Sequence, residues 1–223
     1  MKALKIGRFA LTASVILTLA SCNRNEYIVK RLTPEQKEAF AQNIYGEYPG
    51  KYLILYTNKE CKENEAYEEI VTNAQVDVSN YWMSHVFFQD FPVSLISKVV
   101  DADEALSQAL AKADPLAICA RYSFQYDTDN SNIIWSYSPN EMLLKLNYNG
   151  EDHNILVEFD NAHRYYKATE DELKQPNAFN HLTKACLSLR LKAIYDGHKL
   201  IQDFISGNGN EMDILFKTTK DKI

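Results

Sequence analysis

The feature of this sequence that most limits its fold is the alternation of apolar and polar side chains in "LAICARYSFQY", residues 116–126. Every second position is apolar, namely Leu116, Ile118, Ala120, Tyr122, Phe124 and Tyr126. The positions between them include Cys119, Arg121, Ser123 and Gln125. Successive side chains of an extended chain point to opposite faces, so this run predicts a β-strand with one apolar and one polar face.

Other short runs with strand character follow one another along most of the chain. Residues 51–57, "KYLILYT", are apolar on both faces, which predicts a central strand. Asn149–Gly150 and Asp196–Gly197 are typical of two-residue hairpin turns. The remaining predicted strands are residues 74–79, 83–88, 132–137, 141–148, 154–159, 185–195, 198–204 and 212–217.

Helical patterns are few and short. In "TPEQKEAFAQNIYG", residues 33–46, Thr33 and Gln36 form a predicted capping box, and Pro34 fits the first helical position. A helical insertion near 93–112 interrupts the strands. Long helices do not alternate with strands, which argues against a parallel α/β fold. The expected fold is mainly β (β-rich α+β), an antiparallel barrel or sandwich of about eight to ten strands with an N-terminal helix.

The N-terminus carries the marks of an export signal. Lys2, Lys5 and Arg8 precede an apolar run at 9–20, which is too short for the roughly 20 residues of a membrane-spanning helix. The run ends in "LASC", residues 19–22, which resembles the lipobox of bacterial lipoproteins. The alternative is an ordinary secretory signal with a chance cysteine.

The lipobox resemblance sets the expected organisation of the chain. It implies a signal peptide at 1–21, a lipidated Cys22 with a tether at 22–32, and a single β-rich domain at 33–223. Two or three acyl chains on Cys22 would anchor the protein stably in a lipid bilayer. Loss of the signal peptide removes three basic side chains and leaves 21 basic against 30 acidic residues, a formal charge of −9. This acidity argues against a nucleic acid partner.

Three cysteines would remain besides the anchor, and an odd number permits at most one intramolecular disulfide. Three pairings are open. The pair Cys119 and Cys186 is favoured because both are expected on the more polar face of long strands. Cys61 lies in the acidic loop "NKECKENEAYEE", where carboxylates disfavour a thiolate, so a catalytic cysteine is not expected.

A search for motifs that carry chemistry returns none. There is no glycine-rich phosphate loop, nucleophile elbow, His-Glu-x-x-His or Cys-x-x-Cys. Residues 127–132, "DTDNSN", resemble the start of a calcium loop. However, Asn132 stands where that loop needs glycine, and Ser138 stands where it needs a bidentate glutamate. The five histidines lack metal-ligand spacing. We therefore expect no catalytic residues, no metal and no cofactor.

The layout of the chain resembles the uncharacterised cell-envelope lipoproteins of Bacteroides and its relatives. The resemblance rests on the lipobox, the polar tether, and a helix running into "IYGEYPGKYLILY", with "FQDFPVSLI" further on. Gly46, Tyr48 and Gly50 match a Gly-x-Tyr-x-Gly-like element that enters the first strand of a lipocalin-like (calycin-like) or other compact β-fold. The resemblance implies no catalytic residues. Some surface-exported relatives carry an acidic run after the lipidated cysteine. Here "NRNE" follows, which favours the outer membrane facing the periplasm.

Two classes of function are consistent with these features, and neither is enzymatic. The first is a binding protein for a small apolar or glycan ligand, because inward aromatic side chains of a barrel can line a cavity. Trp82 and Trp135 are then candidate stacking residues, although core packing is the simpler interpretation of both. The second is a structural, assembly or protein-interaction component of the cell envelope. A filled interior and an exposed apolar patch would favour the second class.

Overall fold

The computed structural model describes residues 30–62, 65–80, 83–160, 165–176, 178–183, 186–206 and 209–219, without the side chains of residues 181 and 183. The chain divides into two compact units, residues 1–30 and 31–223, and the second contains all the elements below. The predicted signal peptide and Cys22 lie outside the described residues, as does Trp82.

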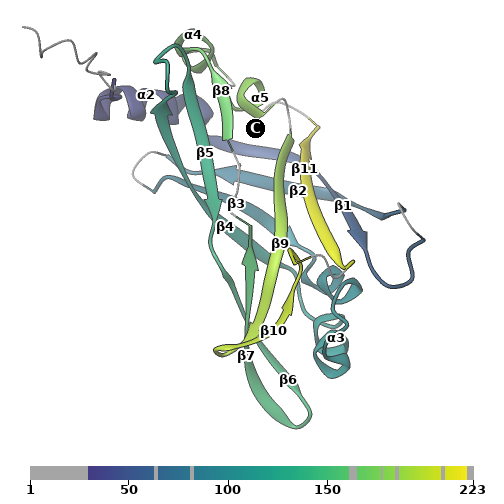
Figure 1. The fold of residues 1–223 in the computed structure, drawn as a ribbon. Helices are drawn as coiled ribbons and strands as arrows, with labels where there is room; N and C mark the ends of the chain where they lie inside the picture. The colour runs from purple at the N-terminus through teal and green to yellow at the C-terminus, as the bar shows by residue number, and fades with distance from the viewer. Residues whose placement is uncertain are drawn as a thin grey trace, which may run out of the picture. The chain divides into compact units, whose positions relative to one another are not determined.

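Most of the described elements are strands that follow one another in runs, and the helices are few and short (Figure 1). The helices are α2 (Pro34–Ile44), the 3-10 helix η1 (Val93–Lys98), α3 (Glu104–Leu110), α4 (Glu170–Leu173) and α5 (Ala178–Thr183). The strands are β1 (Gly46–Thr57), β2 (Tyr67–Val78), β3 (His85–Phe91), β4 (Leu116–Tyr126), β5 (Ile133–Pro139), β6 (Met142–Tyr148), β7 (Glu151–Phe159), β8 (Tyr165–Ala168), β9 (Cys186–Asp196), β10 (Lys199–Asp203) and β11 (Glu211–Thr218).

All the strands belong to one antiparallel sheet. Ten of them follow the order β6-β7-β9-β11-β1-β2-β3-β4-β5-β8, and β10 pairs with β9 beside this path. The predicted fold class is confirmed, in the form of a single curled sheet rather than two stacked ones (Figure 1). Among the described strands, β6 and β8 are the two ends of the order and do not pair with each other.

Strand β1 lies in the middle of the sheet, as its apolar character predicts. It pairs with β2 on one side and with the last strand, β11, on the other. The residues of the glycine–tyrosine element have a structural explanation in this strand. A Cβ atom on Gly50 would collide with the Lys217 carbonyl oxygen and the Phe216 ring of β11. Tyr48 is fully buried, and its ring lies 4.1 Å from that of Phe179.

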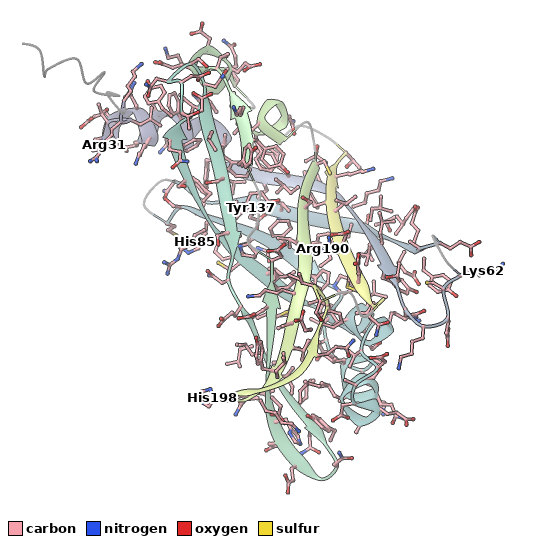
Figure 2. The ribbon with its side chains drawn as sticks, viewed as in Figure 1. Arg31, Lys62, His85, Tyr137, Arg190 and His198 are labelled. Carbon is pink, nitrogen blue, oxygen red and sulfur yellow. The ribbon has the colours of Figure 1, made fainter. Side chains whose placement is uncertain are left out.

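The sheet curls until β5 approaches β9, although five strands lie between them in the order. Along residues 186–190, β9 pairs with β11 only, so one edge of this half of the strand has no neighbouring strand. The Tyr137 hydroxyl donates to the Ser188 carbonyl oxygen at 2.6 Å and accepts from the Ser188 amide at 2.8 Å. The Tyr166 hydroxyl donates to the Cys186 carbonyl oxygen at 2.9 Å. Figure 2 labels Tyr137 among the strands of the sheet. Two tyrosines therefore take the place of a hydrogen-bonding strand.

The interior of the curl is packed with aromatic rings around Trp135, which has no exposed surface. The Trp135 ring lies 5.3 Å from Tyr137, 5.7 Å from Tyr166 and 6.0 Å from Phe179. Rings at such separations, in tilted and edge arrangements, pack favourably. The concave side of the sheet is thus a filled core.

The helices agree in part with the sequence pattern. α2 begins with the expected capping box, in which Thr33 and Gln36 exchange hydrogen bonds of 3.2 and 2.9 Å. The first part of the insertion near 93–112 is the 3-10 helix η1, and the second is α3, which ends two residues before Lys112. α5 was not predicted from the sequence, and neither was β8.

Candidate functional site

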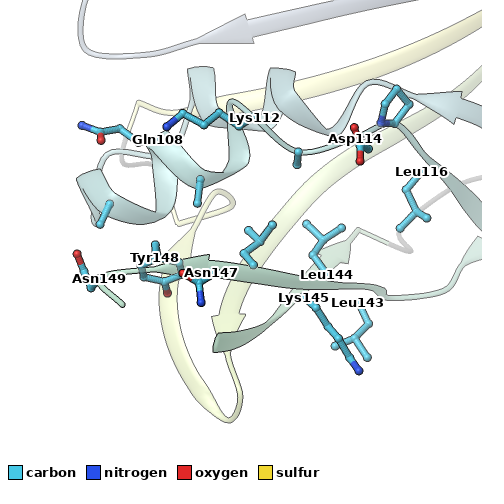
Figure 3. Close-up of a pocket in the computed structure, with 15 residues that line it drawn as sticks. Gln108, Lys112, Asp114, Leu116, Leu143, Leu144, Lys145, Asn147, Tyr148 and Asn149 are labelled. Atoms are coloured by element: carbon cyan, nitrogen blue, oxygen red, sulfur yellow. The ribbon is translucent and has the colours of Figure 1, made fainter. Parts of the chain in front are cut away.

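The described part of the chain contains a cleft of about 620 Å³ between α3 and the edge strand β6 (Figure 3). We call this cleft the α3–β6 groove. Its residues are Ala105, Gln108, Ala109, Lys112, Ala113, Asp114, Pro115, Leu116 and the segment 143–149. One wall is therefore α3 with the turn after it, and the other is β6, the strand at one edge of the sheet.

The helical wall is shaped by the periodicity of α3. Asp103 caps the helix by accepting a hydrogen bond of 3.0 Å from the Leu106 amide. Leu106 and Leu110 point into the core and are fully buried. Another set of positions, spaced three and four residues apart along the helix and the turn after it, faces the groove. These residues are Ala105, Gln108, Ala109, Lys112 and Ala113. Three alanines on this wall leave room beside β6.

The strand wall is an unpaired edge. Asn149 and Gly150 form a two-residue turn with φ values of 53° and 81°, as the sequence predicts. The two residues that flank such a turn, here Tyr148 and Glu151, form a hydrogen-bonded pair. Because hydrogen-bonded pairs recur at every second residue of an antiparallel ladder, the even-numbered residues of β6 are the ones that hydrogen-bond to β7. The backbone groups of Leu143, Lys145 and Asn147 therefore face away from the sheet. Within the described residues no hydrogen bond reaches these groups.

The open edge of β9, unlike that of β6 within the described residues, is bonded to other groups of the protein. The bare edge of β9 is completed by the two tyrosine hydroxyls and by the Asp160 amide, which donates to the Arg190 carbonyl oxygen at 2.8 Å. No described side chain does the same for β6. An unpaired strand edge is a template for another extended segment.

Apolar side chains at one end of the groove are open to solvent. Leu143 is 58% exposed and Leu116 is 41% exposed. The alternation in β4 predicts an inward Leu116, whereas the structure places it at the mouth of the groove, since β4 begins there. Two leucines exposed beside an open strand edge mark a surface suited to binding.

The charges of the groove differ in sign from the chain as a whole. The full sequence has a formal net charge of −6. The groove contains Lys112 and Lys145 against Asp114. Neither lysine forms an ion pair with a described residue. In Figure 3 the Lys112 side chain lies on the helical wall, whereas the Lys145 side chain extends from β6 away from α3.

A polar cluster lies at the turn end of the groove. The Tyr148 ring stacks on His153 at 3.8 Å, and His153 Nδ1 lies 2.7 Å from Asp196 Oδ2. Burial, and then the charges of Asp196 and Asp103, raise the pKa of Tyr148 to about 12. Its phenol thus stays protonated at neutral pH and acts as a hydrogen-bond donor rather than a base.

The polar side chains of the groove are amides, two lysines, an aspartate and a tyrosine. Of the described residues that line it, none is a serine, threonine, cysteine or histidine. In the described part of the chain, no cluster of three or more acidic, histidine or cysteine side chains is placed to hold a metal ion. The arrangement can donate and accept hydrogen bonds, attract carboxylates and cover apolar side chains.

The tryptophan expected to stack on a ligand has another role. Trp135 packs the core and does not line the groove. The strand alternation could not distinguish these roles, because an inward side chain lines a cavity only when the barrel is hollow. The residues that do form the groove were missed. A usable signal existed in "MLLKLNY", where Leu143 breaks the outward polar pattern.

The predicted Cys119–Cys186 disulfide is not present. Cys61, Cys119 and Cys186 are free in the structure. β4 and β9 are five steps apart in the sheet order and do not pair with each other. Burial raises the pKa of the Cys119 and Cys186 thiols, which makes both poor nucleophiles.

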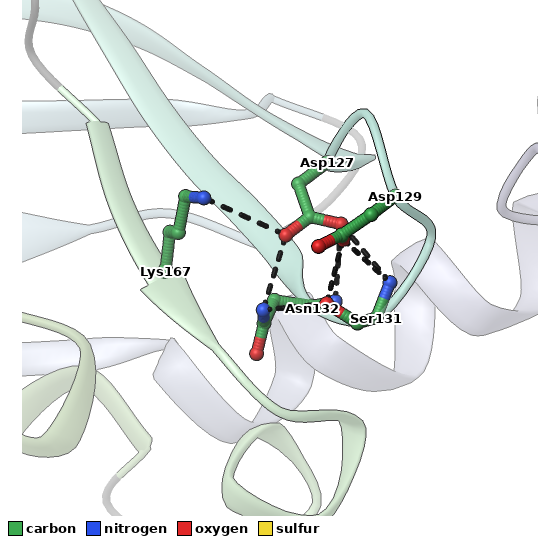
Figure 4. A network of polar contacts seen from close by, with 5 residues as sticks. All are labelled: Asp127, Asp129, Ser131, Asn132 and Lys167. Carbon is green, nitrogen blue, oxygen red and sulfur yellow. Dashed lines mark hydrogen bonds and ion pairs between the residues drawn. The ribbon is translucent and has the colours of Figure 1, made fainter.

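The calcium-like segment is a hairpin tip held by its own side chains (Figure 4). Asp127 Oδ1 accepts hydrogen bonds from the amides of Ser131 at 3.0 Å and Asn132 at 3.2 Å. Lys167 of β8 lies 3.6 Å from Asp127 Oδ2. Hydrogen bonding with the Asp129 side chain, and then with Asn132 and Ser131, lowers the pKa of Asp127 against the opposing effect of burial. The carboxylate oxygens are therefore engaged in closing the turn.

These features define a mainly antiparallel β protein with one curled sheet, a filled interior and a surface groove along an open edge. The chain belongs to the family described as "Domain of unknown function (DUF4840)", whose model matches residues 43–179. No curated protein matches the chain. The ywiB protein from Bacillus subtilis has a similar crystal structure with a TM-score of 0.31 and 9% sequence identity, over 80% of this chain and 97% of that one. In the described residues, no helix has the length and apolar character needed to cross a bilayer.

Proposed function

We propose that this protein is a lipid-anchored component of a bacterial cell envelope that binds a partner protein through the α3–β6 groove and catalyses no reaction. The observation that carries the proposal is the pair of a filled interior and an open strand edge. Trp135 and its neighbouring rings occupy the space that a lipocalin-like ligand would need. The unpaired backbone of Leu143, Lys145 and Asn147 offers hydrogen bonds to an extended chain.

The anchor is the second part of the proposal. Cys22 at the end of a lipobox-like segment supports attachment by acyl chains, and the sequence after it favours the periplasmic face of the outer membrane. Arg31 lies at one end of the folded unit in Figure 2, and His198 lies toward the other end, near the β6–β7 hairpin.

A small apolar ligand in the same groove is a second candidate. The cleft volume falls within the range of about 300–1,000 Å³ that is typical of ligand pockets. The exposed Leu116 and Leu143 favour an apolar group there. Such a ligand would raise the melting temperature of the purified protein without forming a covalent crosslink to another chain.

Photo-crosslinking in intact cells tests the proposed interaction. A photoreactive amino acid at position 143 should give a discrete crosslinked product with another protein, and one at the exposed position Ile205 should not. Lys145→Pro should abolish the product, because it removes an outward amide while leaving the bonds to β7. Crosslinks of equal yield at both positions, or none at 143, would contradict binding at the groove.

The anchor is tested separately. Cys22→Ser should move the protein from the membrane fraction to the soluble fraction and stop incorporation of a palmitate analogue. Retention of the label in Cys22→Ser would show that lipidation does not occur at this cysteine.

A further inference from the structure

We propose that the partner segment is acidic, and that it binds as an extra strand beside β6 with its apolar side chains facing α3 and its carboxylates on the side of Lys145. This inference rests on the proposed function, since it names the chemistry of the partner of the same groove. Its basis is that the groove combines an open strand edge with two lysines that have no ion pair among the described residues.

The geometry of an added strand follows from the register of β6. Leu143, Lys145 and Asn147 each present one amide and one carbonyl, so a segment of about five residues could form a regular ladder with them. Alternate side chains of that segment would face α3, where Ala105 and Ala109 leave space for apolar groups. The others would lie on the side of Lys145.

Charge selects the partner of this edge. An ammonium group attracts a carboxylate, and opposite charges across neighbouring strands stabilise a sheet. A long stretch of lysine-rich chain would instead place like charges beside Lys112 and Lys145. The groove thus favours a segment in which acidic and apolar residues alternate.

Two other occupants of the groove, a second copy of the protein and the ends of its own folded unit, are less consistent with the structure. A second copy joined through β6 would bring four unpaired lysines into one interface, between two chains that are both acidic overall. The ends of the folded unit do not reach the groove. Thr219 donates to the Pro49 carbonyl oxygen beside the start of β1, and Figure 1 shows α2 at that same end, away from β6.

Peptide binding to the full chain tests the inference. The probes are two labelled eight-residue peptides, one alternating glutamate with valine and one alternating lysine with valine, measured by fluorescence anisotropy at low salt. The glutamate peptide should bind at least about tenfold more tightly, and its affinity should fall as salt rises. N-methylation of all the amides of the peptide should abolish binding, because neither edge of the peptide can then donate hydrogen bonds to β6.

Charge reversal provides the decisive comparison. The double variant Lys112→Glu/Lys145→Glu should prefer the lysine peptide. The matched variant Lys199→Glu, on the exposed start of β10, should keep the preference of the natural protein. Unfolding in urea confirms that each variant folds.

Each outcome distinguishes this inference from the proposed function. Equal binding of both peptides would overturn the acidic partner and leave protein binding at the groove intact. Failure of both peptides to bind, with the crosslink at position 143 still formed, would overturn strand addition by an acidic segment. A dimer that dissociates in Lys145→Pro would assign the edge to a second copy and overturn the inference in favour of self-association.

Discussion

At the scale of single residues, the tyrosines do more than fill the core. Abundant aromatic residues in a β-rich chain indicate packing, and Tyr137 and Tyr166 do pack against Trp135. Their hydroxyls also complete the edge of β9. This second role could not be predicted from the sequence, because it depends on how far the sheet curls.

The bond pair between Tyr137 and Ser188 gives a direct prediction. Tyr137→Phe keeps the ring but leaves the Ser188 amide and carbonyl without the hydroxyl. Loss of these partly buried bonds should lower the free energy of unfolding by about 1–3 kcal/mol in urea denaturation. The exposed Tyr165 is the matched control, and Tyr165→Phe should change the free energy by less than about 0.5 kcal/mol. Equal effects of the two substitutions would contradict the role of the hydroxyl.

The lowered pKa of Asp127 predicts that the free energy of unfolding depends on pH. Its pKa in the folded protein is lowered below the ordinary value of 3.8. The carboxylate therefore contributes stability above that value, and the contribution is lost as the pH falls through the lowered pKa. The difference in unfolding free energy between the natural protein and Asp127→Asn should shrink as the pH is lowered from about 6 to about 2. Urea denaturation across this range measures it, and a constant difference would argue against the carboxylate.

At the scale of elements, local chemistry was the most predictable. The capping box of α2 and the turn at Asn149–Gly150 both lie where the residues indicate. The long alternation at 116–126 coincides with β4 at both ends. Strand β8 was missed because it has four residues, and four residues show no reliable period. The groove was missed because it forms between α3 and β6, which only the fold brings together.

The cap of α2 can be tested on its own. Thr33→Ala removes the side-chain oxygen that accepts from the Gln36 amide. The free energy of unfolding should fall by about 1 kcal/mol. Thr33→Ser keeps the hydroxyl and should recover most of this loss in the same urea titration. A serine variant as unstable as the alanine variant would show that the methyl group, and not the cap, is responsible.

At the scale of the whole molecule, the segment that matches the family model does not contain all the strands of the sheet. It ends at residue 179, whereas β9, β10 and β11 follow that residue. The fragment 43–179 would leave β1 without β11 and the core without Leu187, Leu189 and Phe216, all buried. We expect this fragment to show no cooperative unfolding transition by circular dichroism, while the fragment 31–223 does. A cooperative transition in 43–179 would show that the shorter segment folds alone.

The pairing of β1 with β11 also has a consequence in time. A ribosome makes β1 long before β11, so the middle of the sheet stays incomplete until β11 has been synthesised. Contacts between residues this distant along a chain form slowly. Until they form, the growing polypeptide exposes an unpaired strand edge that can aggregate. The newly made polypeptide therefore keeps one edge of β1 unpaired until β11 has been synthesised.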